Sequence, residues 1–157
     1  MKKILAFFVL TLSVFLLAAC GTKTPEEIIK TELQESYIGY SENKGNTYPF
    51  AAYDGVLTFD KENYSITNSK GHMKYFSILG EDQVPTLAQA IIDEHAEELK
   101  DSHHFSIIVS RHKNPKWEDT EGGYHIALSD GGKSIRIFEL NRDSRDYGYY
   151  DFSGKAK

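Results

Sequence analysis

The chain has 157 residues, of which 40% are hydrophobic and 26% charged, and its formal charge at pH 7 is −5. Its length suits one domain with its own hydrophobic core. The acidic balance disfavours a nucleic-acid-binding protein, because such proteins present a basic surface. The chain contains one cysteine, which excludes an intrachain disulfide, so its stability has to come from the core.

The N-terminus begins with two lysines and continues with an uncharged stretch. Lys2 and Lys3 precede a run from Ile4 to Leu17, and small residues and a cysteine follow that run. This layout is typical of an export signal. The run is shorter than the ~20 apolar residues that cross a bilayer comfortably, so a transmembrane helix is the less favoured interpretation.

The end of this segment reads LAAC over residues 17–20 and contains the single cysteine. The pattern resembles the lipobox of bacterial lipoproteins, and the resemblance covers about the first 21 residues. It implies that residues 1–19 are a signal peptide, that the Cys20 thiol takes a diacylglycerol, and that further acylation, such as palmitate, follows at the new N-terminus. A thiolate is the strong nucleophile that such a lipid transfer uses. A chance cysteine after an ordinary secretory signal is the alternative.

Removal of residues 1–19 changes the charge of the expected mature protein. It takes away two lysines and no acids, which leaves 16 basic against 23 acidic residues and a formal charge of −7. We therefore expect the acyl chains on Cys20, and not basic side chains, to hold the protein at the cell membrane, facing outside the cytoplasm. Residues 20–24 then form a short tether, and residues 25–157 form one domain.

The domain is predicted to open with a helix. Thr24 is a helix cap, Pro25 suits the first helical position, and Glu27 completes a capping box. The apolar face of this helix consists of Ile28, Ile29, Leu33 and Tyr37. A narrow apolar face of this kind is typical of a helix that lies over a sheet, and Gly39 is expected to end it.

The remaining elements are predicted to be short strands and a second helix. Alternating or apolar segments bounded by turn residues predict strands at 56–59, 64–67, 73–79, 105–111, 124–129, 134–140 and 147–152. A helix is predicted over 87–100, with Thr86 as its cap and with Leu87 and His95 within its apolar stripe. Asp130, Gly131 and Gly132 predict a tight hairpin turn. We therefore expect an α+β fold in which two helices pack on a mainly antiparallel sheet of about six to seven short strands.

The histidines are the first candidates for chemistry, because His95, His103 and His104 fall within ten residues. A zinc site needs three or four ligands that converge. His103 and His104 are adjacent and would point to opposite faces of a strand, while His95 belongs to an apolar stripe. We therefore expect no metal and no cofactor, and a metal-binding carrier that uses these histidines is the alternative.

No catalytic signature was found in the sequence. The chain has no Gly-x-Ser-x-Gly nucleophile motif, and its single cysteine is assigned to lipid attachment. Carboxylates are plentiful, but no pattern distinguishes a catalytic pair. The favoured interpretation assigns no catalytic residue and no enzymatic activity. A small envelope hydrolase that uses the histidines and carboxylates stays open as the alternative.

Aromatic residues give the remaining functional signal. Trp117 lies in a polar segment, and Tyr147, Tyr149 and Tyr150 lie close together near the C-terminus. Exposed tryptophan and tyrosine are enriched where proteins bind partners, so these four residues form a candidate interaction surface; an ordinary strand and a folded-back loop are the alternatives. The sequence thus predicts a lipid-anchored protein whose domain binds an envelope partner in an accessory, inhibitory or exclusion role.

Overall fold

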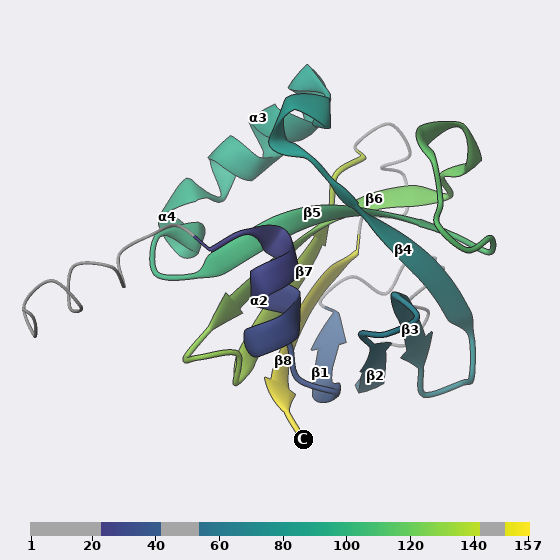
Figure 1. Cartoon of the computed structure of the whole chain (residues 1–157). Helices are drawn as coiled ribbons and strands as arrows, with labels where there is room; N and C mark the ends of the chain where they lie inside the picture. The colour runs from purple at the N-terminus through teal and green to yellow at the C-terminus, as the bar shows by residue number, and fades with distance from the viewer. Residues whose placement is uncertain (1–22, 42–53, 142–149) are drawn as a thin grey trace, which may run out of the picture.

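The computed structural model describes residues 23–41, 54–141 and 150–157. These residues form a closed barrel of eight antiparallel strands, in which each strand pairs with the next along the chain and β1 pairs with β8 (Figure 1). The strands are β1 Ser36–Ser41, β2 Asp54–Asp60, β3 Ser65–Asn68, β4 Met73–Leu79, β5 His103–Ser110, β6 Gly122–Ser129, β7 Ser134–Glu139 and β8 Asp151–Ala156.

The predicted α+β fold is wrong, because the sheet closes on itself. The first and last strands pair from Tyr37 opposite Ala156 to Ser41 opposite Phe152, so their backbone groups satisfy one another. Closure removes the two free edges that an open sheet would present to water or to other chains. The expected strands from β2 to β7 are all present; the strand predicted at 73–79 has the bounds of β4, and the others have shifted ends. The last strand begins at Asp151, and residues 147–149 of its predicted range lie outside the described residues.

The helical elements are short. They are α2 Pro25–Thr31, α3 Thr86–Glu94 and α4 Ala96–Leu99, with 3-10 turns η1 Glu81–Gln83 and η2 Trp117–Asp119. The predicted capping box at the start of α2 is confirmed, because Thr24 and Glu27 bond reciprocally. The predicted extent of this helix is wrong, because Tyr37 lies in β1.

Tyr37 fits a helical spacing in the sequence but is held by a distant part of the chain. Its side chain is fully buried, its hydroxyl donates to the Gly132 carbonyl oxygen at 2.8 Å, and it accepts from the Gln34 N–H at 2.9 Å. These bonds join the start of β1 to the turn between β6 and β7. Tertiary packing therefore overrides the local apolar pattern at this position.

The second predicted helix is present but divided. Pro85, and not Thr86, precedes the first helical residue, and no side-chain cap bond forms there. The backbone leaves helical geometry at His95, with φ −97° and ψ 8°, and α4 follows. The imidazole of His95 stacks on Phe138 of β7 at a ring-centroid distance of 4.3 Å. The two helices lie together against the outer wall of the barrel (Figure 1).

Side chains fill the inside of the barrel. Inward positions of the strands alternate with outward ones, and the inward side chains form one buried cluster, which also includes Ile28, Ile29 and Leu33 from α2 and its C-terminal flank. Eight-stranded barrels are narrow enough for their side chains to occupy the lumen. In the described part of the chain, α2 therefore seals one end of a packed barrel.

The predicted hairpin turn between β6 and β7 is confirmed. Asp130, Gly131 and Gly132 all adopt positive φ values, between 54° and 84°. A Cβ on Gly132 would lie 1.9 Å from the Glu32 carbonyl oxygen, so only glycine permits this approach to the end of α2. In the described ranges, no helix has both the length and the hydropathy needed to cross a membrane.

Candidate binding groove

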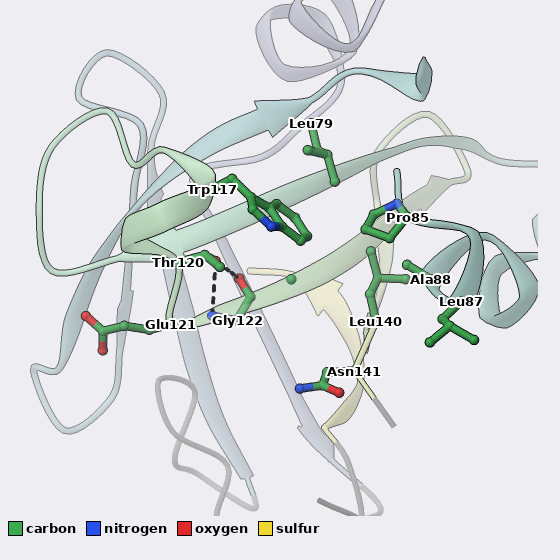
Figure 2. Close-up of a pocket in the computed structure, with 11 residues that line it drawn as sticks. Leu79, Pro85, Leu87, Ala88, Trp117, Thr120, Glu121, Gly122, Leu140 and Asn141 are labelled. Atoms are coloured by element: carbon green, nitrogen blue, oxygen red, sulfur yellow. Dashed lines mark hydrogen bonds between the residues drawn. The ribbon is translucent and has the colours of Figure 1, made fainter. Parts of the chain in front are cut away.

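An apolar groove lies on the outer surface of the barrel, at the start of β6 and the end of β7 (Figure 2). It encloses about 380 Å³. We call it the Trp117 groove. It is lined by Leu79, Pro85, Leu87, Ala88, Trp117, Thr120, Glu121, Gly122, Gly123, Leu140 and Asn141. Four segments of the chain, namely the end of β4, the start of α3, η2 with β6, and the end of β7, meet in this groove.

The indole of Trp117 forms one wall of the groove. Trp117 begins η2, and its side chain is 54% exposed. The turn is fixed at its far end, where the Thr120 hydroxyl donates to the Gly122 carbonyl oxygen at 3.0 Å and accepts from the Gly122 N–H at 3.3 Å (Figure 2). These bonds hold the end of η2 against the beginning of β6.

The opposite wall belongs to α3. Leu87 is 78% exposed and is the most exposed large hydrophobic side chain of the described residues, whereas Ala88 beside it is buried against the barrel. Leu140 forms part of the floor and is also buried. A largely apolar hollow between two exposed apolar side chains is a typical binding surface.

Trp117 also lines a second hollow of about 380 Å³ on the neighbouring part of the surface. That hollow, here called the Ile108 hollow, is lined by Ser77, Ile78, Leu79, Gln83, Ile108, Pro115, Lys116 and Trp117. Leu79 and Trp117 line both spaces. The indole is therefore a wall shared by two adjacent hollows.

Carboxylates surround this part of the surface. Glu121 lines the Trp117 groove, but it contacts Lys74 at 2.5 Å and Arg111 at 3.4 Å, so its charge is compensated. Burial is the largest single effect on the pKa of Glu121 and raises it. The two cations and the Arg111 backbone N–H together outweigh burial, so the pKa is lowered overall. Asp82 in η1 and Glu118 and Asp119 in η2 are exposed. No other described residue forms an ion pair within 4 Å of these last three carboxylates.

The structure separates the three histidines that the sequence grouped. His95 faces Glu98 at 3.4 Å, and His103 faces Glu32 at 2.7 Å. His104 instead meets His125 of β6, with 2.9 Å between its Nδ1 and the His125 Nε2. Within the described residues, no three or more histidine, cysteine, aspartate or glutamate side chains converge as metal ligands.

His125 links two partners on the outer wall beneath α3. Its Nδ1 lies 2.9 Å from the Ser106 hydroxyl and its Nε2 bonds His104, which gives a Ser106–His125–His104 chain. The chain lines a hollow of about 210 Å³ together with Glu81 and Gln89. The contact between Ser106 and His125 could not be predicted from the sequence, because it depends on the register that places Ser106 opposite His125.

A serine bonded to a histidine is the arrangement that nucleophilic catalysis uses, so the base strength of His125 matters. Burial, with smaller contributions from the neighbouring His104 and His95, lowers the pKa of His125 to about 3. A general base works best when its pKa is near the working pH. His125 is thus a weak base at neutral pH, and the chain is better suited to satisfying buried polar groups.

The other predicted surface residues do not join Trp117. Tyr150 is 3% exposed and packs inside the barrel, where its ring lies 6.1 Å from those of Tyr124 and Phe152. It therefore belongs to the core. Tyr147, Tyr149 and Cys20 lie outside the described residues.

Comparisons of the chain with protein-family models, with curated proteins and with solved structures found no match.

Proposed function

We propose that this protein is a lipid-anchored component of the bacterial cell envelope whose barrel binds another envelope protein through the Trp117 groove and performs no chemistry of its own. The groove is the observation that carries the binding proposal. It places Trp117 and Leu87, which are two of the most exposed large hydrophobic residues described, on opposite walls of one apolar hollow. Such side chains are costly to leave in water unless they are covered at some stage.

The N-terminal sequence supports the lipid anchor. Two lysines, an uncharged run and the LAAC segment ending at Cys20 agree with a lipoprotein signal. The first described residue after this segment is Lys23, whose ammonium pairs with Glu32 at the C-terminal end of α2. On this proposal only residues 21 and 22 lie between the acylated cysteine and Lys23, so the domain sits close to the bilayer.

The packed lumen favours a surface site over an internal one. Ligand-carrying barrels enclose a cavity, whereas the inward side chains of this barrel form a continuous buried cluster. The alternatives that the sequence left open, a metal-binding carrier and an envelope hydrolase, depend on the histidines. Those residues occupy separate places apart from the His104–His125 pair.

Site-specific photocrosslinking in cells tests the proposal. A photoreactive amino acid replaces Leu87 in the anchored full-length protein, and we expect a discrete crosslinked protein after irradiation. The same substitution at Ile38, which is 53% exposed on β1, is the matched control and should give no such adduct. Addition of Trp117→Ser to the Leu87 probe should abolish the adduct. Equal adducts from both positions, or none from Leu87, contradict the proposal.

A further inference from the structure

We propose that the Trp117 groove takes a segment of a partner protein in which large aliphatic side chains are flanked by lysine or arginine, an inference that rests on the function proposed above. The segment places an aliphatic side chain in the groove and its cationic groups beside three exposed carboxylates. Those carboxylates, here called the acidic rim, are Asp82, Glu118 and Asp119.

The apolar part of this inference follows from the walls of the groove. Leu79, Pro85, Leu87, Ala88, Trp117 and Leu140 contribute apolar side chains to a space of about 380 Å³. That space exceeds the volume of one leucine or phenylalanine side chain, and small-molecule pockets begin at about 300 Å³. Its apolar lining favours an aliphatic or aromatic group over a sugar, whose hydroxyl groups need more polar partners than Asn141 and Thr120.

The Ile108 hollow adds a second position for an apolar group. Because Trp117 and Leu79 line both hollows, a segment that crosses the indole reaches both of them. Bound peptides commonly use alternate side chains in this way, with successive pockets selecting them. Two large aliphatic residues with a spacer between them therefore match this surface better than one.

The cationic part follows from charge. Glu118 and Asp119 directly follow Trp117, and Asp82 lies in the connection between β4 and α3 that also supplies Leu79 and Pro85. These three carboxylates form no ion pair with the other described residues, whereas Lys116 is the nearest cation along this segment. Lysine or arginine on the partner would find carboxylates that no described residue pairs with. An anionic lipid surface would be repelled by the same groups.

Binding of labelled peptides to the full-length protein tests the inference. The protein is held in nanodiscs of zwitterionic phosphatidylcholine. The first probe is a fluorescein-labelled peptide with two leucines flanked by lysines, the second has glutamates in place of the lysines, and the third has serines in place of the leucines. We expect the first probe to bind at least about tenfold more tightly than either of the others.

Variants of the protein identify the surface that binds. Leu87→Ser and Trp117→Ser should each weaken the first probe about tenfold or more, since both remove a groove wall. Glu118→Gln with Asp119→Asn should weaken it severalfold and reduce its dependence on salt. Ile38→Ser, and Glu97→Gln with Asp101→Asn, are the matched apolar and charge controls, and they should leave binding unchanged.

Three results would overturn the inference. These are equal affinity for the lysine and glutamate probes, binding unaffected by Leu87→Ser and Trp117→Ser, and displacement of the probe by an N-acetylglucosamine oligomer or by vesicles containing phosphatidylglycerol. A crosslink at Leu87 without discrimination between the peptides would remove the cationic chemistry and leave the proposed function intact. Peptide discrimination without any crosslink in cells would support the cationic chemistry and contradict the proposed function.

Discussion

His125 is a buried base whose environment makes the stability of the barrel depend on pH. Burial lowers its pKa in the folded state from the ordinary 6.5 to about 3. As the pH falls below about 6.5, His125 is therefore protonated in the unfolded chain but stays neutral in the folded chain. The folded state, which holds His125 neutral, is therefore fully stable with respect to this group above the pKa of the unfolded chain. It loses that stability as the pH falls towards the pKa of His125 in the folded state. We expect His125 alone to lower the free energy of unfolding by about 2 kcal/mol between a pH of about 7 and about 5.

Chemical denaturation at a series of pH values measures this effect on the chain that begins at position 20 and carries Cys20→Ser. His125→Gln should be less stable at neutral pH and should lose less on acidification. His104 also has a lowered pKa, caused chiefly by burial, so a residual slope is expected. Carboxylates with lowered pKa, such as Glu32 and Glu121, act only at more acidic pH. Parallel curves for His125→Gln and the parent chain would contradict the prediction.

At the scale of the element, the seam between β1 and β8 decides whether the sheet is open or closed. Gly39 lies opposite Gly154 in this pairing, and a Cβ on Gly39 would lie 2.0 Å from the Ser153 carbonyl oxygen and 2.8 Å from the Phe152 ring. The Ser153 carbonyl oxygen belongs to the backbone, so it cannot move aside without disturbing the pairing of β1 with β8. We therefore expect Gly39→Ala to lower the free energy of unfolding by about 2–3 kcal/mol.

A second glycine in a strand gives the control for the seam. Gly123 is the second residue of β6, and a Cβ there would meet its nearest neighbour, the Leu140 Cβ, at 3.7 Å, which is ordinary contact. Gly123→Ala should therefore change stability by less than about 1 kcal/mol. Thermal and denaturant unfolding of both variants make the comparison. Equal losses of unfolding free energy in the two variants would contradict the prediction that the close approach at Gly39 requires glycine.

The long-range pairing of β1 with β8 separates the features that the sequence predicts from those that it does not. Strands β2 to β7 follow from local alternation and turn residues, and the Asp130–Gly132 turn follows from its composition. Tyr37 was predicted as helical, because Ile29 and Leu33 precede it at helical spacing. Its place in β1 depends on pairing with β8, more than a hundred residues away. Closure of the barrel was therefore invisible in any local window.

The candidate site shows the same limit. Trp117 was predicted as an interaction residue, because a tryptophan in a polar segment is conspicuous. Leu87 was assigned to the buried stripe of a helix, yet it is the most exposed hydrophobic residue described. Tyr150 was predicted on the surface and lies in the core, because its inward position precedes that of Phe152 by two residues. Local composition identifies a candidate residue, whereas the register of the barrel decides its exposure.

At the scale of the whole molecule, the charge expected for the proposed mature chain predicts how it would be held at a membrane. Removal of residues 1–19 would leave a formal charge of −7, which gives no general attraction to anionic lipids, so on the proposed function the acyl chains on Cys20 supply the binding. We expect membranes to retain the protein through a wash in about 1 M salt, which screens charges beyond ~3 Å, and to release it in nonionic detergent. An alkyne analogue of palmitate should label the protein in cells but leave Cys20→Ser unlabelled. Release by salt alone would identify electrostatic attachment, and an unlabelled protein that stays with the membrane would identify an uncleaved N-terminal helix.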